Sequence, residues 1–260
     1  MKDYLEIEKS IIKTYRSSIW APFIKAIEEF SLIENNDKVL VCLSGGKDSL
    51  LLGKLFQQLK KHKKYNFECK FIFINPGFNK DKLDVIRKNF MKLNLDVYIE
   101  NTDIFDSFKG DESCYRCALA RRSNIYKLAN KFKFNKIALG HHYNDIIETT
   151  LLNLIYNGKI NTILPLKSSN EDSNLKIIRP MYFIKEDSII RWIKYNQIII
   201  NDNKCPFIDN LLKDNQIQNR EKIKNLIDDL QKINPNADKN IFNALLDVNL
   251  ASLKSYNKEK

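Results

Sequence analysis

The chain has 260 residues, enough for one or two domains with a sizeable buried core. Hydrophobic residues make up 43% and charged residues 29% of it, which excludes a disordered, low-complexity or collagen-like chain. The longest apolar run, Val39–Leu43, is far shorter than the roughly 18 residues that a membrane-spanning helix needs. The first residues lack the apolar stretch of a secretion signal. We therefore expect a cytoplasmic protein with no membrane partner.

The chain is strongly basic, because its 43 Lys and Arg residues outnumber its 32 Asp and Glu residues and give a net charge of +11. Such a surplus attracts polyanions, among them nucleic acids and acidic lipids. Much of it is lysine in a chain rich in Lys, Asn and Ile, so charge alone does not identify the partner. Five cysteines, an odd number, argue against a disulfide framework and predict reduced thiols.

The spacing of apolar residues predicts an α/β fold. Helical patterns at residues 4–15 and 19–33 predict an N-terminal helical extension, residues 1–33. Four apolar strands then alternate with three helices; the strands are residues 38–43, 67–75, 96–99 and 136–139, and the helices 49–61, 80–93 and 117–132. Such strands form a parallel sheet covered on both faces, which predicts one domain over residues 34–210. Patterns at residues 217–233 and 241–253 predict a C-terminal helical segment, residues 211–260.

The turn after the first strand carries the clearest signal of a ligand. Only seven glycines occur in the chain, and two of them stand together in SGGKDS, residues 44–49. Free backbone N–H groups at a helix start, with no side chain on the glycines, form a cradle for phosphate. Lysine adds a positive charge, the serines add hydroxyl donors, and Asp48 offers a carboxylate to Mg²⁺. The residues predicted to bind phosphate here, and ATP under the resemblance described next, are Ser44, Gly45, Gly46, Lys47, Asp48 and Ser49.

A simple tight turn is the alternative, and the Walker pattern is absent because no glycine stands five residues before Gly46. The motif SGGKDS instead resembles the PP-loop of the ATP-pyrophosphatase superfamily. That resemblance implies ATP bound on a Rossmann-like, HUP-type parallel sheet. It also implies activation of a substrate oxygen by adenylation, with release of pyrophosphate.

Three further stretches narrow the resemblance. INPGFNKD, CYRCALARRSNIYKLA and GHHYNDIIETTLLNLIYNG, followed by IIRPMYFIKEDSI, resemble in order and spacing the TtcA-like tRNA 2-thiocytidine synthetases. The resemblance covers most of the chain up to the region of Cys205. It implies a 4Fe-4S cluster on three cysteines and replacement of a base oxygen by sulfur in the tRNA anticodon loop.

Cys114 and Cys117 stand one helical turn apart at a predicted helix start and can present both sulfurs to one metal centre. Helix-start N–H groups and the nearby arginines favour thiolates there. A redox dithiol or half of a zinc site would use the same spacing. Under the resemblance, Cys205 is the third ligand, and three thiolates leave one iron open to carry a sulfide. An ordinary structural cysteine is the other interpretation of Cys205.

The motif GHHYNDIIETT follows the fourth strand and therefore reaches the same sheet edge as SGGKDS. Gly140 and His141 are predicted to contact ATP, and Asp145 to share Mg²⁺ with Asp48. The histidines could instead cap a helix. The resembled group commonly has two aspartates where this chain has Asn144 and Asp145. Whether a second carboxylate binds the metal at this place is therefore an open question.

Basic residues interleave with aromatic residues in two stretches, around Tyr126 and around Trp192. Such stretches could grip a tRNA backbone and stack bases, or they could be amphipathic helices with the aromatic rings inward. Arg121 and Arg122 are predicted to bind tRNA because they lie within two turns of the proposed cluster.

The predicted activity is ATP-dependent tRNA thiolation by a sulfurtransferase of the 2-thiocytidine synthetase type. ATP would adenylate the C2 carbonyl oxygen of an anticodon-loop cytidine, and sulfur delivered through the cluster would displace AMP. We expect tRNA and a sulfur donor, such as a cysteine desulfurase or free sulfide, as partners, with a homodimer left open. The rival interpretations are a PP-loop enzyme that forms thiouridine or lysidine, and a non-catalytic nucleotide- or RNA-binding protein.

Overall fold

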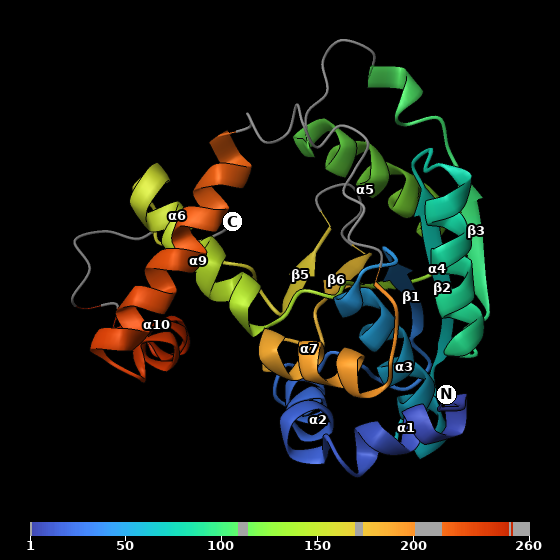
Figure 1. Ribbon diagram of the computed structural model, residues 1–260, viewed down its shortest axis with the longest axis horizontal. Coiled ribbons are helices and arrows are strands. Elements are labelled where there is room, and N and C mark those ends of the chain that lie inside the picture. Colours follow the sequence, from blue (N-terminus) through green and yellow to red (C-terminus); the bar gives the residue numbers. More distant parts are fainter. Residues whose placement is uncertain (1, 109–113, 170–173, 201–214, 250, 252–260) are drawn as a thin grey trace. The chain divides into compact units, whose positions relative to one another are not determined.

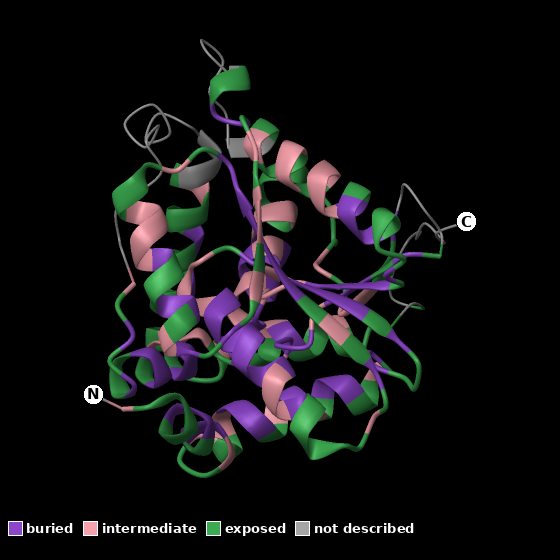
Figure 2. Ribbon diagram, turned by 90° about the vertical axis from the view of Figure 1, so that its right-hand side faces the viewer, coloured by how far each residue is buried: buried purple, intermediate pink, exposed green. Residues whose placement is uncertain are grey.

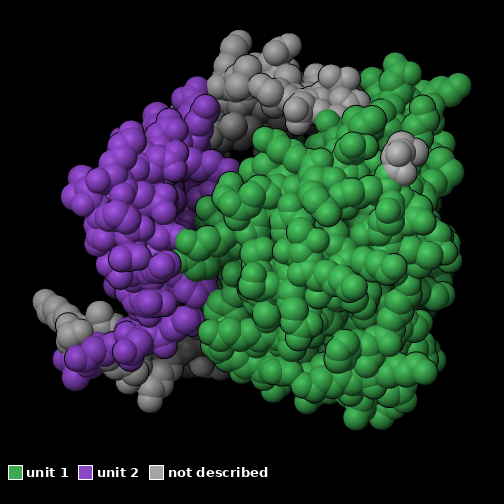
Figure 3. Space-filling model, turned by 60° about the horizontal axis from the view of Figure 1, so that its bottom comes forward, with its two compact units in different colours: residues 1–144, 164–214 green, residues 145–163, 215–260 purple. Residues whose placement is uncertain are grey.

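The computed structural model describes residues 2–108, 114–169, 174–200, 215–249 and 251. The chain divides into two compact units, coloured separately in Figure 3. The first unit comprises residues 1–144 and 164–214, and the second comprises residues 145–163 and 215–260. Within the described ranges, no helix combines the length and apolar character needed to cross a membrane.

The first unit is built on a six-stranded sheet with the order β3-β2-β1-β4-β6-β5. Neighbouring strands are parallel except β5, which runs antiparallel to β6. The strands are β1 (Lys38–Leu43), β2 (Glu68–Asn75), β3 (Val97–Asn101), β4 (Lys136–Ala138), β5 (Leu166–Ser168) and β6 (Lys176–Ile178). The predicted α/β class with a parallel sheet is confirmed, and the four predicted strands are β1 to β4. The short strands β5 and β6 are additions that the sequence pattern did not predict.

Helices connect the parallel strands, as Figure 1 shows. Those of the first unit are α1 (Tyr4–Ile12), α2 (Ala21–Glu29), α3 (Lys47–His62), α4 (Lys80–Lys92), α5 (Cys114–Lys131) and α7 (Glu186–Tyr195). A π-helical turn, Arg16–Trp20, joins α1 to α2, so the predicted N-terminal helices are shorter than their apolar patterns. Helix α6 (Tyr143–Asn157) begins in the first unit and continues into the second, which also contains α9 (Asn215–Ile233) and α10 (Ala237–Leu246).

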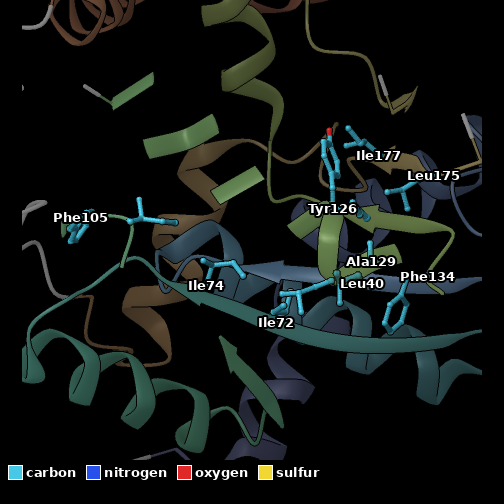
Figure 4. Packing of buried hydrophobic residues seen from close by; sticks show 12 residues of the cluster. Leu40, Ile72, Ile74, Phe105, Tyr126, Ala129, Phe134, Leu175 and Ile177 are labelled. Carbon is cyan, nitrogen blue, oxygen red and sulfur yellow. The ribbon is translucent and has the colours of Figure 1, made fainter. Parts of the chain in front are cut away.

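Alternate side chains of a strand point to opposite faces of the sheet, and here side chains on both faces are buried. Figure 4 shows the cluster on the α5 face, which includes Leu40, Ile72, Ile74, Tyr126, Ala129, Ile137 and Ile177. On the other face the ring of Phe73 lies 5.8 Å from that of Phe90 in α4. Figure 2 shows the resulting concentration of buried residues along the strands. The sheet is therefore a rigid base from which loops leave at its carboxyl edge.

Helix α1 is attached to the rest of the first unit by buried polar contacts. The fully buried ammonium of Lys54 in α3 donates to Glu8 at 2.9 Å and to the carbonyl of Leu93 at 3.0 Å. Trp192 in α7 is also fully buried, and its indole N–H donates to the Ser10 hydroxyl at 3.0 Å. Buried charges are tolerated when they are paired in this way. The interpretation of the stretch around Trp192 as an amphipathic helix with its aromatic ring inward is confirmed.

Candidate active site

The turn between β1 and α3 has a backbone that requires glycine. Gly45 has φ +82°, a conformation that L side chains rarely adopt, and a Cβ there would lie 2.9 Å from Ile86. Gly46 is the N-cap of α3, and no side chain caps the helix. The first N–H groups of α3 are thus left for another acceptor.

The start of α4 differs from that of α3 in its capping, whereas α2, α7 and α10 also begin without a side-chain cap. Both α3 and α4 begin with Lys-Asp, but α4 is capped by Asn79, whose side chain accepts the N–H of Lys82 at 3.0 Å. At α3 no described side chain accepts an N–H group of the first turn: Ser44 donates to Ser49 at 3.2 Å and accepts the N–H of Gly46 at 3.4 Å, and Ser49 donates to the Gly46 carbonyl at 2.9 Å. An uncapped helix start with a positive partial charge is a binding site for anions.

The loop after β4 packs directly on this turn. A Cβ on Gly140 would lie 3.4 Å from the backbone carbon of Asp48 and 3.4 Å from the backbone nitrogen of Ser49. Strands β1 and β4 are neighbours, so their carboxyl ends place the two loops together, as the sequence predicted. His142, which is buried, has its Nε2 3.5 Å from Asp48 Oδ1. His141 is half-buried in the same loop.

Lys47 lies between two carboxylates. Its Nζ is 3.2 Å from Asp48 Oδ2 and 2.9 Å from Glu186 Oε1. Burial lowers the pKa of Lys47, but the charges of Asp48 and Glu186 outweigh this effect and raise the pKa above its ordinary value. The lysine is therefore a firmly charged group beside the open helix start.

Glu186 is a residue that the sequence analysis assigned no role. It begins α7, and its backbone N–H donates to Asn144 Oδ1 at 2.9 Å. Asn144 stands where the resembled group has an aspartate. Its side-chain oxygen is therefore an uncharged acceptor for the first backbone N–H of α7. An acidic residue in the first turn of a helix usually only complements the helix dipole, so no sequence pattern indicates that Glu186 reaches Lys47.

Asp145 and Glu148 belong to the second unit, where basic side chains of α9 bind them. The guanidinium of Arg220 contacts Asp145 and donates from Nε to Glu148 at 2.8 Å. Lys224 lies 3.5 Å from Glu148, whose carboxylate is buried. These contacts neutralise two carboxylates on successive turns of α6.

The predicted cysteine pair lies on α5. Helix α5 begins at Cys114, and Cys117 follows one turn later as a half-buried, reduced thiol packed against the core. Cys205 lies outside the described residues. Among the residues that are described, no group of three metal-ligating side chains is present.

Basic side chains accompany the cysteine pair. Arg121 is half-buried on α5 and Arg122 is exposed. Burial, together with the nearby charge of Arg122, lowers the pKa of Arg179 to about 10. Arg179 follows β6 at the carboxyl edge of the sheet. The charges of Arg122 on α5 and of Arg179 at this edge are therefore close enough to interact.

Residues 19–206 match the family model described as the PP-loop domain. The tRNA-cytidine(32) 2-sulfurtransferase 1 of Francisella philomiragia is 36% identical over 233 residues, which cover 86% of this chain and 87% of the relative. The tRNA-cytidine(32) 2-sulfurtransferase of Paraburkholderia phytofirmans is 34% identical over 233 residues, and the chain spans 66% of that relative's length.

A similar fold occurs in the solved structure of the U34-tRNA thiolase NcsA from Methanococcus maripaludis, described with its 4Fe-4S cluster. The two folds superpose with a TM-score of 0.67, and the match covers 90% of this chain and 80% of the thiolase at 22% sequence identity. Identity at this level shows a common fold.

Proposed function

Because the chain belongs to the PP-loop family and to the family of the tRNA-cytidine(32) 2-sulfurtransferases, we propose that it is an ATP-dependent tRNA thiolase. Its substrate is an anticodon-loop cytidine, whose C2 oxygen is replaced by sulfur. The observation that carries this proposal is the uncapped start of α3, with Gly140 of the second loop packed against it. That arrangement suits a nucleoside triphosphate held at the carboxyl ends of the neighbouring strands β1 and β4.

In the proposed reaction, ATP places its phosphates at Ser44–Ser49. The C2 carbonyl oxygen of the cytidine attacks the α-phosphorus, and pyrophosphate leaves with the electron pair of the broken P–O bond. The base oxygen thereby becomes part of an adenylate, and a sulfur nucleophile then displaces AMP. Lys47 and the N–H groups of α3 stabilise the charge that develops on the phosphates.

Mg²⁺ is the cation that commonly accompanies ATP, and Asp48 is suited to hold it. The oxygen Asp48 Oδ1 is buried and makes no hydrogen bond to any described residue. A buried carboxylate oxygen in that state favours a cation as its partner. When bound, the ion would neutralise phosphate charge. Asp145 remains a proposed second ligand, and it must first be released by Arg220.

A 4Fe-4S cluster is proposed to be held by Cys114, Cys117 and Cys205. Two thiols one turn apart at the start of α5 fit such a group, and Cys117 is reduced. When bound, the cluster would supply the sulfur for the reaction. The sulfur donor, a cysteine desulfurase or free sulfide, stays a prediction.

The experiment that tests the function combines anaerobically purified protein with unmodified tRNA, ATP, Mg²⁺ and sulfide. Mass spectrometry of the digested tRNA should detect 2-thiocytidine, and its formation should require ATP. Formation of 2-thiouridine or lysidine would contradict the proposed substrate. The absence of any new nucleoside, under conditions where a known thiolase works, would contradict the proposed activity.

Arg121 and Arg122 are expected to contact the tRNA backbone. Replacing both with Glu should weaken tRNA binding roughly tenfold and lower the slope of log affinity against log salt by about 1 to 2, because fewer counterions are released. Binding measured over a range of salt concentrations checks this prediction.

The matched control is a second pair of adjacent basic residues, Arg87 and Lys88, which are exposed on α4. Their replacement by Glu makes the same change in net charge on the opposite side of the sheet. It should leave the salt slope close to that of the original protein. Equal slopes for both double variants and the original protein would mean that Arg121 and Arg122 only face water.

A further inference from the structure

We propose that Glu186 is a carboxylate ligand, together with Asp48, of the Mg²⁺ ion that accompanies ATP, and that Lys47 occupies this cation position until the ion arrives. The inference rests on the proposed use of ATP. It extends the site to α7, a helix that contains none of the residues predicted to bind nucleotide or metal.

The geometry around Lys47 supports this assignment. Oxygens of Asp48 and Glu186 approach one ammonium group at 3.2 and 2.9 Å, although the two residues come from α3 and α7. Two carboxylates that converge on a single cation can also accept a small divalent cation, which prefers oxygen ligands. All three side chains are half-buried, with 29% of Lys47, 29% of Asp48 and 20% of Glu186 exposed.

Glu186 is held in place independently of Lys47. Its backbone N–H is bound by Asn144, and the next loop contact joins the N–H of Tyr143 to the carbonyl of Ile184 at 3.0 Å. The start of α7 is therefore fixed to the loop that packs on α3. Because that loop is fixed, the carboxylate of Glu186 keeps its reach to the phosphate site when Lys47 moves away.

The charges in direct contact leave the site unsuited to ATP without a metal. Lys47 contributes one positive charge, whereas Asp48 and Glu186 contribute two negative charges, so the group carries a net negative charge. A polyphosphate would be repelled by this excess. A divalent cation reverses the sign of the local charge, and it releases the Lys47 ammonium to donate to the phosphates.

Asp48 Oδ1 is buried without a hydrogen bond to a described residue, and its nearest charged neighbour is His142 Nε2 at 3.5 Å, so the oxygen can still accept a cation at this end of α3. By contrast, the carboxylate of Asp145 is already bound by Arg220 within the second unit. At Glu186, the divalent cation would take the place of the Lys47 ammonium. The exchange breaks the ion pair from Glu186 to Lys47 and replaces it with a carboxylate–metal contact, with no change in covalent bonding.

The test measures ATP binding to the full chain, without tRNA, while Mg²⁺ is titrated upward from EDTA. The original protein should bind ATP only when the metal is present. Glu186→Gln keeps the size of the side chain and removes its charge. We expect this variant to need at least tenfold more Mg²⁺ for half-maximal ATP binding, and to bind ATP more tightly than the original protein in EDTA. Electron paramagnetic resonance of Mn²⁺ should show the same loss of metal affinity.

The matched control is Asp187→Asn, which removes the same charge from the next residue of α7. Asp187 is 72% exposed and pairs with Arg191 at 3.0 Å, so its replacement should leave the Mg²⁺ requirement unchanged. Asp48→Asn should shift the requirement at least as far as Glu186→Gln. Circular dichroism checks that each variant is folded.

Four outcomes would overturn the inference. Two concern the variants: the same Mg²⁺ dependence in Glu186→Gln as in the original protein, or an equal shift in Asp187→Asn. Two concern the original protein: ATP binding that is the same in EDTA as with Mg²⁺, or no ATP binding at any Mg²⁺ concentration. Failure of the proposed function is separate, because it is read from tRNA nucleosides. A chain that modifies no tRNA but shows the expected shift in Glu186→Gln retains the metal site and loses the thiolase assignment.

Discussion

Asp48→Ala is expected to abolish ATP-dependent pyrophosphate release, with a rate loss of about 10² to 10³ or more, and to leave the iron content unchanged. The carboxylate lies at the uncapped start of α3, beside Lys47 and His142. Its removal takes away the proposed metal ligand and one of the two negative partners of Lys47. The cysteines of α5 use none of these contacts. Pyrophosphate release with tRNA present, and iron per chain, are the two measurements.

Helix α4 offers the matched control, Asp81→Ala. Asp81 occupies the same position in a helix that also begins with Lys-Asp, but that helix is capped by Asn79. Its replacement should reduce stability only slightly, since an exposed first-turn carboxylate contributes about 0.3 to 1 kcal/mol through the helix dipole. If both aspartate variants turned over ATP at the original rate, the start of α3 would not be the phosphate site.

The fold could be predicted where apolar residues form long, regular patterns. Strands β1 and β2 are apolar along most of their length, and the helix between them, α3, buries every residue from Ser49 to Phe56. Strands β5 and β6 escaped prediction because each has only three residues, and three of those six are Lys167, Ser168 and Lys176. Their extended conformation depends on pairing with each other and with β4, which no local pattern reveals.

The turn proposed to bind phosphate could be singled out from the sequence because glycine is rare in this chain, and in the structure Gly45 has a positive φ. The approach of Gly140 to α3 also followed from the order of the strands. Glu186 could not be predicted, because its reach to Lys47 depends on how α7 returns to the sheet. The ion pair between Asp145 and Arg220 could not be predicted either, because the two residues come together only through the packing of α6 and α9.

Cysteine replacements test the proposed cluster. Cys205→Ala should lose most of its iron and acid-labile sulfide and lose tRNA thiolation, because two thiolates are too few to retain a 4Fe-4S cluster through purification. Cys117→Ala should have the same effect, and it removes a thiol that the structure places one turn into α5. ATP binding should survive in both variants, since Ser44–Ser49 do not depend on the cysteines. The measurements are iron and sulfide per chain on anaerobically prepared protein.

Cys42→Ala supplies the control, because Cys42 lies within β1 and burial raises the pKa of its thiol to about 12. A thiol that stays protonated is a poor metal ligand and behaves as a small apolar side chain. Its removal should cost about 1 to 2 kcal/mol of folding stability and leave the iron content intact. If Cys205→Ala kept as much iron and activity as Cys42→Ala, the third ligand would lie elsewhere. If Cys117→Ala also kept them, delivery of sulfur through a cluster on α5 would be wrong, while adenylation at α3 would be unaffected.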